Sequence, residues 1–136
     1  MNGWRWPYFK PEEILSPEGL HQYLQRNVLL VQPILLDKLE LFRQQLEKPL
    51  LINHNGLQYR GYRSPRENYE IVKGEKYSFH MQGLAADISV SNMTTLDLFE
   101  AAIKCGFNGV GFYPQKKFVH VDMRANILGK PVTWII

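Results

Sequence analysis

Apolar residues recur at helical spacing through the first half of the chain. Between residues 34 and 48 one face is apolar and the other is polar, with Leu35, Leu39, Phe42 and Leu46 on the first and Asp37, Lys38, Arg43, Gln44 and Glu47 on the second. This spacing predicts an amphipathic helix that packs on a core. A shorter helix is predicted from Ser16-Pro17 to Leu24, because serine caps helices and proline suits the first helical position.

Alternation with a period of two replaces the helical spacing in the second half. Within 85–91, Ala86 and Ile88 share one face of a predicted strand, while Asp87 and Ser89 share the other. The remaining predicted elements are a short strand at 50–52, a helix at 94–106, a hairpin of strands at 109–113 and 118–123, and a last strand at 132–136.

Turn-forming residues and an aromatic segment complete this outline. Asn53-His54-Asn55-Gly56 predicts a turn that opens a hairpin, and residues 70–76 are predicted to form a polar loop. The opening aromatic residues, Trp4, Trp6, Tyr8 and Phe9, are predicted to lie over the core, with a sugar-binding platform as the alternative. The pattern indicates an α+β fold in a single domain, 1–136, with an antiparallel sheet and helices packed on one side.

Composition narrows the class of protein. The chain has 136 residues, of which 45% are hydrophobic and 21% charged, and it lacks the ~20 consecutive apolar residues of a membrane span. The net charge of +3 mildly favours anionic partners. No block of basic residues interleaved with aromatics points to nucleic acid. We therefore expect binding to neither membrane nor nucleic acid. The chain is also expected to be a monomer.

The cysteine content and the start of the chain bear on its compartment. The lone Cys105 excludes an internal disulfide framework and is expected to be a small, half-buried apolar residue. The first residues lack a basic segment followed by an apolar run, so no secretory signal is expected and synthesis in the cytoplasm is predicted.

Two histidines and a carboxylate have the spacing of a metal site. His80 and Asp87 flank Gly83, and His120 follows in a predicted strand. Catalytic zinc is held by three such ligands and leaves a fourth position for water, whose pKa falls to about 7. Each residue alone also suits a loop, a strand edge or a core, but together they favour zinc. A fourth histidine, His54, is expected to be a solvated turn residue.

These motifs resemble a known family. The pattern Ser78-x-His80-x-x-Gly83-x-Ala85-x-Asp87, followed by His120-x-Asp122, resembles the signature of the M15 peptidases, which include zinc D-Ala-D-Ala carboxypeptidases, L-alanyl-D-glutamate endopeptidases and phage endolysins. Three further segments extend the likeness: Tyr8 to Glu13, Gly61 to Pro65 with Asn68, and Gly109 to Arg124.

The resemblance implies a role for several residues. His80, Asp87 and His120 would bind Zn²⁺, and Arg63 would hold the substrate carbonyl and the oxyanion formed from it. Ser78 would orient the ligand loop or bind substrate, and Tyr113 would also contact substrate. The implied fold is that of the hedgehog and D-Ala-D-Ala-peptidase group.

The general base departs from the family pattern. Many members carry an acidic residue three positions before the last histidine, or a histidine two before it, and here these positions hold Lys117 and Phe118. Asp122 is predicted to be the base, with a hydrogen bond to a ligand imidazole as its alternative role. Three acidic residues on nearby loops stay open as bases: Glu67, Glu70 and Glu75.

The predicted function is zinc-dependent hydrolysis of peptide bonds in peptidoglycan stem peptides by an activated water, as a carboxypeptidase or an endopeptidase. The alternative is a noncatalytic zinc-binding module of the same fold, such as a phage structural or cell-wall-binding protein. Because no signal is expected, a phage or prophage lysis protein released to the cell wall would fit.

Overall fold

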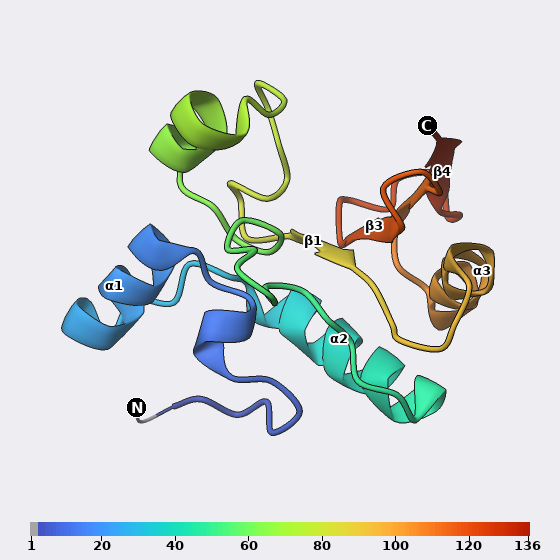
Figure 1. Cartoon of the computed structure of the whole chain (residues 1–136), viewed down its shortest axis with the longest axis horizontal. Helices are drawn as coiled ribbons and strands as arrows, with labels where there is room; N and C mark the ends of the chain where they lie inside the picture. The colour runs from blue at the N-terminus through green and yellow to red at the C-terminus, as the bar shows by residue number, and fades with distance from the viewer. Residues whose placement is uncertain (1–2) are drawn as a thin grey trace.

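A computed structural model describes residues 3–136 of the chain (Figure 1). Its elements, in order, are η1 (Pro11–Glu13), α1 (Pro17–Arg26), α2 (Pro33–Leu46), the π-helix η2 (Glu67–Val72), β1 (Ala85–Ile88), α3 (Thr95–Cys105), β2 (Gly109–Tyr113), β3 (Phe118–Asp122) and β4 (Val132–Ile135). The predicted α+β class is confirmed. Within the described residues, no helix is long and apolar enough to cross a membrane.

The four strands form one sheet in the order β1-β3-β2-β4. β3 pairs antiparallel with both β1 and β2, as the predicted hairpin requires. β4 instead runs parallel to β2, so the sheet is mixed and not wholly antiparallel as predicted. The physical reason is the connection: residues 123–131 cross from the end of β3 to the far side of β2, so β4 starts beside Gly109, the first residue of β2, and runs in the same direction as β2.

The helix boundaries follow local chemistry. Ser16 Oγ accepts a hydrogen bond from Gly19 N at 3.2 Å, and Thr94 Oγ1 accepts one from Asp97 N at 3.0 Å, so both predicted caps form. α3 ends at Gly106, whose φ of +97° suits glycine. The turn at Gly106 leads directly into β2, on which α3 packs.

One face of the sheet packs on helices and the other carries the site. The inward side chains share a single buried core with α2 and α3: Ala86, Ile88, Val110, Val119 and Val121 from the strands, and Leu35, Leu36, Leu39, Leu98 and Ala102 from the helices. Figure 1 shows α2 beside β1 and α3 beside the opposite end of the sheet. The other face holds Asp87, His120 and Gly111 as direct cross-strand neighbours.

Two predicted local elements are wrong. Residues 50–52 form only an isolated bridge between Leu51 and Ser89, and no hairpin follows them. The reason is that Asn53, at the predicted turn, uses its side chain to hold Leu15 O and Arg60 N, at 3.0 Å each. Part of the predicted loop at 70–76 is the end of η2.

The opening aromatic segment is part of the core. Trp6 and Phe9 are each 3% exposed, and Trp6 Nε1 donates to Asp37 Oδ1 on α2 at 2.8 Å. The packing therefore supports the predicted covering of the core and not the sugar-binding platform. Cys105 is also buried and free.

Candidate metal centre

His80 lies on the loop before β1, and its ring is fixed by a backbone carbonyl. The loop turns at Gly83, with φ of +71°, where a Cβ atom would collide with the carbonyl oxygen of Leu30. His80 Nδ1 lies 2.8 Å from Gly61 O. A carbonyl oxygen only accepts, so Nδ1 carries the proton and the lone pair of Nε2 points at Asp87, 3.3 Å from Oδ1.

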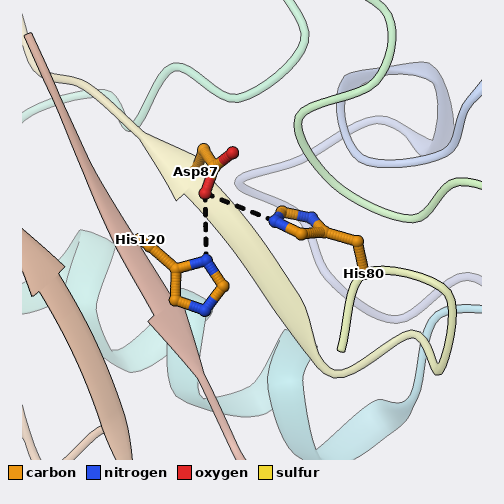
Figure 2. Close-up of side chains that lie close together, drawn as sticks. All are labelled: His80, Asp87 and His120. Atoms are coloured by element: carbon orange, nitrogen blue, oxygen red, sulfur yellow. Dashed lines mark hydrogen bonds and ion pairs between the residues drawn. The ribbon is translucent and has the colours of Figure 1, made fainter. Parts of the chain in front are cut away.

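Asp87 and His120 face each other across the sheet. They are paired directly between β1 and β3, and His120 Nδ1 lies 3.1 Å from the same oxygen of Asp87. Figure 2 shows this oxygen between the two rings, with His80 arriving from the loop and His120 from the strand. The structure therefore brings together the three residues that the sequence singled out.

The far side of the His120 ring contacts a second carboxylate. His120 Nε2 lies 2.8 Å from Asp122 Oδ2. Asp122 is fully buried, and Arg124 donates to both of its oxygens, from Nε at 2.8 Å and from Nη2 at 2.7 Å. In the neutral His120 ring the proton accordingly sits on Nε2, because its partner is an acceptor, and the lone pair of Nδ1 points at Asp87.

These contacts shift the pKa values of the two carboxylates and of His120. Burial opposes charge at Asp122, but hydrogen bonds from Arg124 and His120 outweigh it and hold the pKa of Asp122 well below its usual range. The same balance, with His80 and His120 as partners, lowers the pKa of Asp87. For His120, burial is again outweighed, here by Asp122 and Asp87, and its pKa rises to about 9. Without a cation, the cluster holds a proton instead.

The three groups fit a zinc ion. Two imidazole lone pairs and a carboxylate oxygen converge, and the three ligand atoms all lie within 4.8 Å of one another. A tetrahedral zinc with bonds of about 2.0–2.1 Å separates its ligand atoms by about 3.3 Å. His80 Nε2 lies 3.3 Å and His120 Nδ1 3.1 Å from Asp87 Oδ1, and both distances match that geometry. Each imidazole also has an outer partner, as metal-bound histidines usually do.

Arg63 lies beside this cluster with its guanidinium fixed. Nε donates to Asn68 Oδ1 at 2.8 Å and Nη1 to Tyr59 O at 3.0 Å, and the residue is 8% exposed. Burial lowers the pKa of Arg63 and the charge of Asp87 raises it. The side chain stays cationic and forms part of the wall of the cleft that holds the cluster.

The cleft has a volume of about 550 Å³, and two of its walls were missed by the sequence reasoning. Trp134 lies with its ring 5.2 Å from that of His120 and donates from Nε1 to Tyr113 Oη at 3.1 Å. Arg124 lies over the Trp134 ring at 5.1 Å. Gly111 makes room for Trp134, since a Cβ atom there would lie 2.5 Å from two atoms of the indole, well inside van der Waals contact. A glycine inside a strand was the sequence feature that could have indicated this close approach.

The remaining candidate residues differ in their contacts and in whether they line the cleft. Ser78 is buried and its Oγ accepts from His80 N at 3.2 Å, so it holds the ligand loop. Glu67 is buried among Ser16 and Ser64, and Glu70 pairs with Arg66 at 3.5 Å. Glu75 alone of the three glutamates lines the cleft. His54 is not part of the metal-type cluster found among residues 3–136.

Sequence comparison adds the family. A family model described as Peptidase M15 matches residues 7–122. The chain belongs to the peptidase M15 family. Among curated relatives, the peptidoglycan L,D-endopeptidase MepK of Escherichia coli K12 is 35% identical over 66 residues, and a MepK of Shigella flexneri matches equally. The matched segment covers 46% of this chain and 36% of each relative.

Membership of the M15 family accounts for part of the cleft. His80, Asp87 and His120 lie within residues 7–122, which the family model matches, and so does Arg63. Arg124 and Trp134 lie after this segment. Residues beyond the family match therefore build one wall of the cleft of this M15 protein.

Proposed function

We propose that this M15 protein is a zinc-dependent peptidase that hydrolyses peptide bonds in peptidoglycan stem peptides. The observation that carries the proposal is the convergence of His80 Nε2, Asp87 Oδ1 and His120 Nδ1, each aimed by an outer contact or by sheet pairing. The family and the printed activity of MepK support the peptidase class and the choice of substrate.

The metal-binding role falls to three residues in this proposal. When bound, zinc would supply a Lewis acid and lower the pKa of water to about 7. His80 and His120 would hold it through neutral rings, whose protons are kept on the far nitrogens by Gly61 O and Asp122. Asp87 would add the third ligand and a negative charge.

Arg63 is proposed to bind the substrate carbonyl and the oxyanion that develops from it. Its guanidinium is buried and held by Asn68 and Tyr59, so it needs little reorganisation when charge develops. A fixed donor in a water-poor site is worth about 3–4 kcal/mol of barrier. Tyr113, which lines the same cleft, is also proposed to contact substrate.

We assign the general base to Glu75 and a positioning role to Asp122. Both oxygens of Asp122 already accept hydrogen bonds, the residue is fully buried, and its contact is to the far nitrogen of His120. This geometry favours the second of the two roles considered for Asp122. Glu75 is exposed and, unlike Glu67 and Glu70, lines the cleft, so it is the glutamate that we propose takes a proton from the attacking water.

The test is cleavage of purified muropeptides by the metal-free and zinc-loaded protein. We expect cleavage only with zinc, and product masses will identify the bond cut and so separate carboxypeptidase from endopeptidase action. A His80→Ala variant should lose both zinc retention and cleavage, with His21→Ala, at an exposed position of α1, as the matched control. A zinc-loaded, folded protein that leaves every muropeptide intact would instead indicate the noncatalytic module, and an active His80→Ala variant would refute the metal assignment.

A further inference from the structure

A second cleft lies beside the tip of the β2–β3 hairpin and has a volume of about 670 Å³. Its polar lining includes three cations, one imidazole and several hydroxyl groups: Arg60, Lys116 and Lys117, His54, and Ser89, Ser91, Thr94 and Thr95. Among residues 3–136, no aspartate or glutamate lines it. The composition is that of a site for an anion.

The three cations of this cleft are not neutralised by the fold. Within residues 3–136, the ion pairs involve Arg66, Arg124 and the two cluster histidines, and none involves Arg60, Lys116 or Lys117. Both lysines are exposed on the hairpin turn. Like charges gathered at one concave surface produce a positive potential that concentrates anions.

The second cleft adjoins the metal centre. The Arg60 guanidinium lies over the Phe118 ring at 4.7 Å, and Phe118 also lines the cleft of the metal centre. The backbone carbonyl of Arg60 accepts from Asp87 N at 2.7 Å. Arg60 and Phe118 therefore form a wall between the two clefts, and an extended ligand that passes this wall reaches both.

We propose that this second cleft binds carboxylate groups of the peptide substrate on one side of the bond that is cut. The inference rests on the proposed peptidase function, since it assigns the cleft to the same substrate. Stem peptides contain acidic residues, and a free carboxylate matches the guanidinium of Arg60 and the ammonium groups of Lys116 and Lys117. Phosphate of a wall polymer has the same charge and is the competing source.

The test is a titration of the full chain with a synthetic stem peptide, in chelator to prevent cleavage, followed by amide chemical shifts. The peptide with free carboxylates should shift the amides of Ser89 and Ser91, and the fully amidated peptide should not. A Lys116→Gln/Lys117→Gln variant should bind the free-acid peptide about three- to tenfold more weakly, as expected for loss of two partly solvated charge contacts.

A control variant with the same change in net charge, Lys104→Gln/Lys130→Gln, should bind the free-acid peptide like the unmodified chain. Equal weakening in both variants, or equal binding of free-acid and amidated peptides, would overturn the proposal. Inorganic phosphate supplies the other arm: if it shifts Ser89 and Ser91 where the peptide does not, the cleft is a phosphate site and not part of the substrate site. A chain that binds the peptide as expected but never cleaves it with zinc contradicts the peptidase function and leaves the carboxylate site standing.

Discussion

Replacing Asp122 with asparagine separates the two roles considered for this residue. In the native cluster its Oδ2 accepts from His120 Nε2 at 2.8 Å and from Arg124 Nη2 at 2.7 Å, while Oδ1 accepts from Arg124 Nε at 2.8 Å. In one orientation an amide places its NH₂ group against His120 Nε2 and Arg124 Nη2, and in the other against Nε and the backbone N of Arg124. In the first orientation the His120 ring can remove its part of the conflict only by moving its proton from Nε2 to Nδ1.

That proton shift removes the lone pair that faces Asp87, and with it one zinc ligand. Changes to such outer partners typically weaken metal binding 10–100-fold, or about 1.4–2.8 kcal/mol. Because Arg124 also loses charge-assisted bonds to a fully buried group, Asp122→Asn should lower the free energy of unfolding of the metal-free protein by about 1–3 kcal/mol.

The zinc dissociation constant is measured by competition with a chromophoric chelator, after circular dichroism has shown that the variant is folded. The matched control is Asp97→Asn, which removes the same charge from an exposed position in the first turn of α3 and should leave zinc affinity unchanged. If Asp122 is the base, its asparagine variant will bind zinc normally and lose about 10²–10⁴-fold in kcat. Native zinc affinity in Asp122→Asn would refute the positioning role.

Two further predictions test the base and the ligand loop. Glu75→Gln should lower kcat by about 10²–10⁴-fold with zinc affinity unchanged, whereas Glu70→Gln, outside the cleft, should keep activity; equal kcat values would remove Glu75 from the mechanism. Gly83→Ala should reduce the free energy of unfolding by about 2–4 kcal/mol, because a Cβ atom there would overlap Leu30 O in addition to straining a positive φ. Gly129→Ala has a similar φ of +73° with no atom within 4 Å, so urea denaturation should show a loss of only about 1 kcal/mol; similar losses in both would disprove the packing argument.

The sequence was most informative where local rules determine structure. Strand alternation put Asp87 opposite the core face of β1 and His120 opposite the core face of β3, and the sheet then paired the two residues directly. The caps at Ser16 and Thr94 form as predicted because they depend on neighbouring backbone groups alone. His80 was singled out by its spacing from Asp87 around Gly83 and by the family motif, because its position depends on a loop that alternation cannot describe.

Long-range contacts explain the failures. The turn at Asn53 contains the residues of a hairpin, but its side chain binds Leu15 O and Arg60 N, which no local pattern reveals. Trp134 falls in the last predicted strand, but no local pattern reveals its place against His120, because that place follows from the parallel pairing of β4 with β2. Gly111 carried a usable signal, since a glycine inside a strand often marks close approach of another group.

The role of Asp122 depends on which nitrogen of His120 faces the metal centre. Strand alternation places His120 and Asp122 on one face, and this relationship is the same whether the carboxylate reaches toward the attacking water or toward the far side of the ring. Arg124 decides between them by holding both oxygens of Asp122, and Gly109 leaves the space for it, because a Cβ atom there would meet the Asp122 carboxylate. Since Arg124 lies beyond the segment that the family model matches, the orientation of a ligand inside that segment depends on a residue outside it. In the proposed metal site, the M15 motif therefore supplies the candidate ligands, and the contact of Arg124 with Asp122 determines which nitrogen of His120 faces Asp87.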